Sequence, residues 1–253
     1  MIDNINQKRF FHGNLNYDFT FREIEHHLLE NVTIGKLDKY INLVDEGKCP
    51  NSLFNHPNVP RASRMRIKGL EKVQKNYLLQ YLYKNDLVVR LDGDETSIPS
   101  MVQEVFKNIK ELAINKKPNH EPVLKALLIK DPRSVAIELP VWKVSPTRKV
   151  AESITGHIDL IQVEYRKEKY EIKVMDYKPE GEKKFIFMIP QIAIYALMLA
   201  DKLQPDVECD MNCYIFDKKV VWKFKPDILF KIDDKLKFYG AERSWKPFLD
   251  YFT

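Results

Sequence analysis

Cysteine is scarce in this chain, and the shortage excludes one group of metal centres. Its 253 residues include three cysteines, Cys49, Cys209 and Cys213. Three thiols are too few for a closed four-thiolate iron–sulfur cluster or for a zinc site made of cysteine alone. We therefore expect no iron–sulfur cluster, and we interpret the thiols as small buried residues in a reducing compartment.

Long apolar runs are also missing. The first eight residues, Met-Ile-Asp-Asn-Ile-Asn-Gln-Lys, lack the apolar stretch of a signal peptide. The longest apolar run, residues 192–200, is far too short to span a bilayer. These features predict an intracellular protein with no membrane partner.

The positive charge is modest but unevenly distributed. A net charge of +5 permits nucleic-acid binding without requiring it. Basic residues crowd positions 61–75, and a helix over residues 62–84 would collect several of them on one side. That side could follow a phosphate backbone, although an ordinary solvated helix face explains the same pattern. The candidate nucleic-acid contacts are Arg64, Lys68, Lys72 and, after a later strand, Lys183.

Hydrophobic periodicity and turn residues divide the chain into alternating helices and strands. Helices are predicted at residues 21–31, 34–46, 62–84, 99–115, 185–202 and in the 227–252 tail. Strands are predicted at residues 87–91, 134–144, 154–165, 170–178, 207–216 and 220–224. This order predicts an α/β fold, a mixed β-sheet flanked by helices. Residues 1–60 are expected to form an N-terminal helical region, a cap or a docking element for a protein partner, and residues 61–253 the core.

One predicted hairpin contains the candidate catalytic residues. Residues 154–165 and 170–177 are rich in β-branched and aromatic residues, and a short charged turn joins them. Side chains alternate along a strand, so Asp176 and Lys178 point to the same face. Antiparallel pairing can bring Asp159 next to both.

Two converging carboxylates repel each other unless a cation lies between them. Oxygen ligands suit magnesium or manganese, which could polarise a phosphate and activate water. Lys178 could then offset the charge of the transition state. The alternative is a hairpin with exposed charge pairs, but the flanking residues are apolar, which argues against exposure.

The motifs together resemble a known nuclease superfamily. Gly-x-x-Asp ending at Asp159, then Asp176-Tyr177-Lys178, then Gln-x-x-x-Tyr at Gln191 and Tyr195, resemble the PD-(D/E)xK signature, in particular its RecB-type and lambda-exonuclease-like branch. The resemblance implies a restriction-endonuclease-like core. It also implies that Asp159, Asp176 and the backbone carbonyl of Tyr177 bind metal and that Lys178 is catalytic. Gln191 and Tyr195 would contact nucleic acid or brace the site.

Two glutamates are further candidates. Glu138 lies in an apolar strand, where similar nucleases often carry an acidic residue; it could position a metal-bound water or pair with a lysine. Relatives often have Gly-x-x-x-His on an early helix, but here Val73 follows Gly69 at that spacing. Glu71 is the substitute metal ligand we expect, and a solvated helix residue paired with a nearby lysine is the alternative.

The sequence therefore predicts a metal-dependent deoxyribonuclease that uses Mg or Mn. The resemblance favours an exonuclease, or processing of single strands and duplex DNA ends, in repair, recombination or defence, in the cytoplasm or nucleoid. A structure-specific or site-specific endonuclease on the same core is the alternative. From a different class, the chain could be a catalytically inactive DNA-binding subunit of a larger complex.

Overall fold

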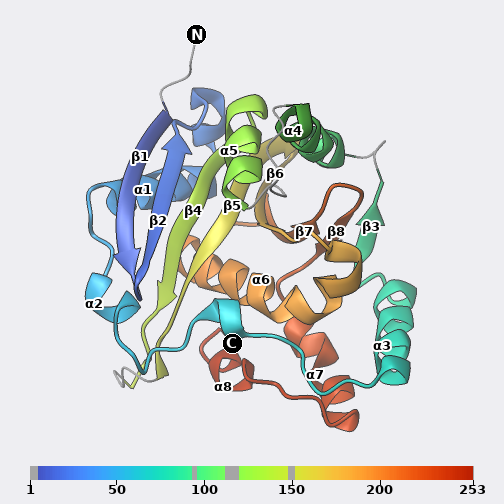
Figure 1. The fold of residues 1–253 in the computed structure, drawn as a ribbon. Coiled ribbons are helices and arrows are strands. Elements are labelled where there is room, and N and C mark those ends of the chain that lie inside the picture. Colours follow the sequence, from blue (N-terminus) through green and yellow to red (C-terminus); the bar gives the residue numbers. More distant parts are fainter. Residues whose placement is uncertain (1–4, 93–95, 112–119, 148–151, 253) are drawn as a thin grey trace.

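One mixed sheet organises the chain (Figure 1). The computed structural model describes residues 5–92, 96–111, 120–147 and 152–252. Within these residues the sheet has eight strands in the order β1-β2-β4-β5-β6-β7-β8-β3. The strands are β1 Ile5–His12, β2 Leu15–Arg22, β3 Val89–Leu91, β4 Ser134–Lys143, β5 Ile154–Arg166, β6 Lys169–Tyr177, β7 Cys209–Phe216 and β8 Val221–Phe224.

Helices cover both faces of this sheet, which confirms the predicted α/β class. Helices α1, α6 and α7 contribute to the larger apolar core on one face. Helices α4 and α5 pack over the other face in a second apolar cluster. The helices are α1 Val32–Asp45, α2 Asn51–Phe54, α3 Lys72–Lys84, α4 Ile98–Glu111, α5 His120–Lys130, α6 Gly181–Leu203, α7 Ile228–Phe238 and α8 Lys246–Leu249, with short 3-10 turns at η1 His26–Glu30 and η2 Ala62–Arg64.

The strand directions follow from the connections. All neighbouring strands are antiparallel except β6 and β7, which are parallel and joined by α6. A parallel pair needs a long crossover, and α6 supplies it. Helix α6 is long and apolar enough to cross a membrane by length and composition, but 72% of its apolar window is buried within the fold. Its burial is compatible with a soluble protein.

The predicted N-terminal helical region is wrong for residues 5–22. These residues form the β1–β2 hairpin, in which Gly13 and Asn14 make the turn at positive φ values of 54° and 68°. Such a two-residue turn matches the twist of a hairpin. Strand β2 then pairs with β4, so this segment extends the central sheet.

Of the two helices predicted near the N-terminus, the structure confirms one. The helix predicted at residues 21–31 is wrong, because the segment holds the end of β2 and the short turn η1. The helix predicted at residues 34–46 is confirmed as α1. It begins where the Asn31 side chain accepts hydrogen bonds from the N–H groups of Thr33 and Ile34.

The helix predicted at residues 62–84 is shorter than expected. The α-helix α3 begins only at Lys72, and before it the chain forms the short 3-10 turn η2 and a segment held by tertiary contacts. Gly69 has a φ of +78°, and the Ile67 N–H donates to the Phe187 carbonyl on α6 at 3.1 Å. The basic residues of this segment therefore do not share one helical face.

Candidate active site

Three acidic residues occupy matching positions on three neighbouring strands. Strand β4 pairs with β5 through Ile137↔Leu160 and Leu139↔Ile158, so Glu138 lies opposite Asp159. Strand β5 pairs with β6 through Leu160↔Met175, which puts Asp159 opposite Asp176 at the next position. Neighbouring strands are about 5 Å apart. The predicted pairing of Asp159 with Asp176 is thus confirmed, and Glu138 completes a row of carboxylates.

Asp159 is held by two donors. Its Oδ2 accepts hydrogen bonds from the Tyr177 backbone N–H at 3.2 Å and from the His120 Nδ1 at 3.1 Å. Burial raises the pKa of Asp159, but the His120 hydrogen bond and the Lys178 charge outweigh burial and leave its pKa below the ordinary value. Asp159 is therefore the ionised member of the row.

Asp176 is fully buried, and both of its oxygens have a partner. Gln191 Nε2 donates to its Oδ1 at 3.2 Å, and the Lys178 ammonium forms a close ion pair with its Oδ2. Burial, and then the charge of Asp159, raise the pKa of Asp176 to about 7. A buried carboxyl group beside a second carboxylate is suited to a cation.

Glu138 is strained and unpaired. Its φ of +53° lies in the left-handed region, which costs a non-glycine residue about 1–2 kcal/mol. Among the described residues it has no hydrogen bond or ion pair, so the alternative that it pairs with a lysine has no support. Burial and the charges of Asp159 and Asp176 raise the pKa of Glu138 to about 8.

Lys178 is the cation of the site. Its ammonium faces Asp176, and the Lys178 side chain is largely buried. Burial lowers the pKa of Lys178, but the charges of Asp176 and Asp159 raise it further, so the net shift is upward. Lys178 therefore stays protonated beside the carboxylates.

The glycine of the Gly-x-x-Asp motif makes room for the tyrosine of the Gln-x-x-x-Tyr motif. A Cβ at Gly156 would lie 2.3 Å from Cε1 of Tyr195. Gln191 Nε2 lies 3.3 Å from the Tyr195 hydroxyl as well as donating to Asp176. Both α6 residues therefore brace the carboxylates, which is one of the two expected roles.

A cavity of about 140 Å³ opens beside this row. Thr155 Oγ1 is buried and has no hydrogen-bond partner. Arg61 Nη1 donates to the Tyr17 hydroxyl at 3.3 Å. The lining includes Glu138, Asp159, Gln191, Tyr195, Arg61, Ser63, Thr155 and Tyr17.

His157 lines the cavity and is paired with a second buried histidine, His12. His12 Nδ1 and His157 Nε2 are 2.8 Å apart, and Tyr17 stacks on the His157 ring at 3.7 Å. Burial lowers the pKa of both histidines, so the pair is neutral near pH 7. Tyr17, which lines the cavity, comes from the β1–β2 hairpin, so the N-terminal segment helps to build the cavity.

The other predicted site residues lie further out. Glu71 is exposed at the start of α3, and its backbone N–H donates to Gln74 Oε1 at 2.9 Å. Its contacts with described residues do not include the carboxylate row, so it is replaced as a metal-ligand candidate by His120. The predicted basic contacts Arg64, Lys68, Lys72 and Lys183 are all exposed.

Two residues near the carboxylates were missed as site residues. His120 lies within residues 117–122, where a Pro- and Asn-containing break is predicted, and nothing in its local sequence marks it. Arg61 belongs to the basic segment but was not singled out. The pairing of Arg61 with Thr155 of β5 brings it to the cavity.

The carboxylates suit a divalent cation by charge and donor type. Burial and the neighbouring carboxylates raise the pKa of both Glu138 and Asp176, as expected for acidic groups that lack a compensating cation between them. Across the described residues, no three acidic, histidine or cysteine side chains form a ready-made metal cluster. The fit therefore rests on the oxygen donor type and on the mutual repulsion of the carboxylates.

Comparisons with protein-family models, with curated proteins and with solved structures found no match to this chain.

Proposed function

We propose that this protein is a metal-dependent nuclease that hydrolyses DNA phosphodiester bonds. The row Glu138–Asp159–Asp176 with Lys178 alongside carries the proposal. A restriction-endonuclease-like core would run from α5 to β7, that is, a helix, three antiparallel strands, a crossover helix and a parallel strand. The motif resemblance points to Asp159, Asp176 and Lys178, and the proximity of these three residues supports the proposal.

Each residue then has a distinct part. Asp159, Asp176 and the Tyr177 carbonyl would hold Mg²⁺ or Mn²⁺, with Glu138 oriented toward the same place. When bound, the metal would supply Lewis-acid activation of the phosphate and of a water molecule. Lys178 keeps a positive charge beside the reacting phosphate and stabilises the charge that develops there.

His120 replaces the histidine missing from the early helix, where Val73 stands. It begins α5, the helix directly before the carboxylate strands, and it hydrogen-bonds Asp159. Such a partner fixes the orientation of a ligating carboxylate, and its imidazole is itself a metal-ligand type. His120 thus restores the kind of group that relatives carry.

The substrate contacts would come from the segment that crosses the site. Arg61 lines the cavity, and the charge of Arg66 acts on Lys178. Lys75 Nζ donates to the Lys183 carbonyl at 3.4 Å, so α3 and the start of α6 lie side by side there. These cations would contact phosphates, which gives binding without sequence readout.

The proposal is tested by cleavage of end-labelled single-stranded and duplex DNA with Mn²⁺, Mg²⁺ or chelator. Wild type is compared with Asp176→Asn, Lys178→Ala and the exposed-lysine control Lys39→Ala. We expect metal-dependent cleavage, retained by the control and reduced about 10²–10³-fold in Lys178→Ala. Mononucleotide products would indicate an exonuclease, and internal fragments an endonuclease.

The nuclease proposal is rejected if none of the proteins cleaves any substrate and if wild type and Asp176→Asn bind DNA equally well. That outcome would favour the DNA-binding subunit instead.

A further inference from the structure

A second cavity lies on the opposite face of the sheet. Glu164 lies four residues from Leu160 on β5, so both face the same side of the sheet, where Leu160 belongs to the apolar cluster of α4 and α5, whereas Asp159 faces the other side. The cavity has a volume of about 530 Å³. This volume is within the range of small-molecule sites.

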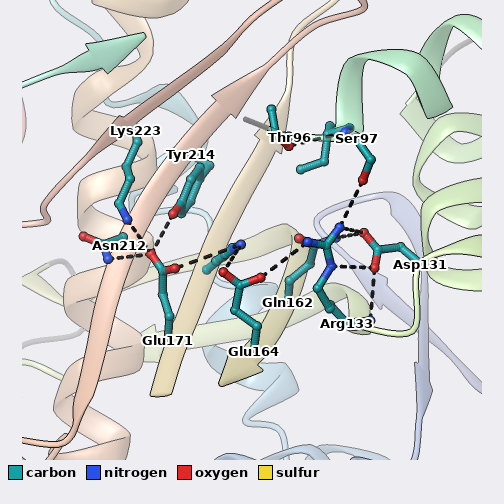
Figure 2. A network of polar contacts seen from close by, with 12 residues as sticks. Thr96, Ser97, Asp131, Arg133, Gln162, Glu164, Glu171, Asn212, Tyr214 and Lys223 are labelled. Atoms are coloured by element: carbon teal, nitrogen blue, oxygen red, sulfur yellow. Dashed lines mark hydrogen bonds and ion pairs between the residues drawn. The ribbon is translucent and has the colours of Figure 1, made fainter. Parts of the chain in front are cut away.

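Its floor is a chain of charges rather than an apolar surface (Figure 2). Arg133 and Lys173 both bind Glu164, at 3.4 and 2.8 Å. Lys223 binds Glu171 at 2.8 Å, and the Lys173 ammonium lies 4.0 Å from the same glutamate. The Glu164, Lys173 and Glu171 side chains are only 11–15% exposed. Apolar residues would often be at least as stable here, so packing alone does not explain the charges.

One buried group in this floor is unsatisfied. Asn212 is 3% exposed and lines the cavity. Its Nδ2 donates to Glu171 Oε1 at 2.6 Å, and the Tyr214 hydroxyl donates to the same oxygen at 2.6 Å. Asn212 Oδ1, however, accepts from nothing. Buried acceptors normally have a donor, so this oxygen indicates a missing one.

The rim of the cavity is basic. Arg166, the last residue of β5, and Lys167, in the β5–β6 turn, are exposed and have no ion pair among the described residues. Lys169 lies beside them and is 3.9 Å from Asp210. Asn212 is paired with Lys173, four residues along β6 from Lys169. At about 3.3 Å per residue, the unsatisfied acceptor and the basic rim are roughly 13 Å apart.

We propose that this cavity binds a nucleoside phosphate. The phosphate would lie on Arg166 and Lys167, and an amino or hydroxyl group of the base or sugar would donate to Asn212 Oδ1. Tyr214 lines the space between, with its ring 5.5 Å from the Lys173 ammonium and 5.5 Å from the Lys223 ammonium. The proposal uses none of the nuclease residues and stands independently of the nuclease.

Calorimetry tests it, with the four nucleoside 5′-monophosphates, ribose 5-phosphate and inorganic phosphate as probes. Chelator in every sample removes binding through a metal at the carboxylate row. We expect one or more nucleotides to bind with a Kd on the order of 10–100 µM and inorganic phosphate at least about tenfold more weakly.

The variants locate the site. Arg166→Gln/Lys167→Gln should weaken nucleotide binding by about tenfold or more, because charge-assisted contacts are lost. Asn212→Ala should weaken nucleotides but not inorganic phosphate. Lys39→Gln/Lys237→Gln makes the same change in net charge on exposed lysines elsewhere and should leave binding unchanged.

Three results would overturn the proposal. They are no binding of any nucleotide, equal binding by wild type and Arg166→Gln/Lys167→Gln, and equal affinity for nucleotides and inorganic phosphate. Asp176→Asn should bind the nucleotide as wild type does. Loss of binding in that variant would move the nucleotide to the carboxylate row and also overturn the proposal.

Discussion

Gly156→Ala tests the contact between the two motifs that surround the carboxylates. The added methyl would lie 2.3 Å from Cε1, 2.9 Å from Cδ1 and 3.3 Å from Cζ of Tyr195. Tyr195 is 2% exposed, so its ring has little space in which to move. A clash with a buried ring forces either the strand or α6 to shift.

Overpacking of this kind lowers the free energy of unfolding by about 1–3 kcal/mol. For a chain of this size each kcal/mol corresponds to roughly 2–4 °C, so the melting temperature should fall by roughly 2–12 °C. Movement of Tyr195 also disturbs Gln191 and its hydrogen bond to Asp176. Nuclease activity should therefore fall more than stability alone explains.

The assay is urea unfolding of wild type, Gly156→Ala, Tyr195→Ala and the double variant. Because Tyr195→Ala removes the obstructing ring, Gly156→Ala should cost much less in that background. Gly35→Ala in α1 is the matched control, since its Cβ would meet nothing nearer than 3.7 Å and a helical alanine should be neutral or stabilising by about 1 kcal/mol. An equal cost of Gly156→Ala with and without the Tyr195 ring would refute the packing argument.

Three further predictions concern the carboxylates. Since folding raises the pKa of Glu138 from 4.5 to about 8, the folded state holds a proton that the unfolded state releases, and the stability contributed by Glu138 falls as pH rises across that window. In metal-free urea unfolding, the free energy of unfolding of Glu138→Gln should therefore rise relative to that of wild type as the pH is raised from 6 to 8.5. A difference between the two proteins that does not change with pH would contradict this. His120→Gln removes the imidazole beside Asp159 and should weaken Mn²⁺ binding about 10–100-fold by calorimetry, whereas unchanged affinity would exclude His120 from the site. Gln191→Ala leaves Asp176 Oδ1 without its donor and should lower the free energy of unfolding by about 1–3 kcal/mol in chelator. If loss of the hydrogen bond is the cause, Gln191→Ala should cost less when it is made in the Asp176→Asn background.

Local pattern was enough to predict the centre of the site. Alternation and a short turn placed Asp159 beside Asp176, because a hairpin with a short loop leaves few possible registers. Helical spacing put Gln191 and Tyr195 on one face of α6. These relations depend on residues near one another in sequence or on adjacent strands.

The missed features depend on tertiary contacts or on overlooked turn chemistry. His120 reaches Asp159 only because α5 packs against the sheet, and no spacing rule joins positions 39 residues apart. The extended segment before Lys72 is stabilised by Ile67 binding to α6, which outweighs its helical pattern. The N-terminal hairpin carries a local signal, Gly13-Asn14 between alternating residues, within the segment that was assigned only to a helical region.

Mn²⁺ titration of wild type and Asp159→Asn, followed by calorimetry at pH 8, tests most directly whether the carboxylate row is a metal site. The account predicts saturable binding by wild type and its loss, or weakening by about 10²-fold or more, in Asp159→Asn, while both proteins remain folded by circular dichroism. Equal binding by both proteins, or none by wild type, would contradict it.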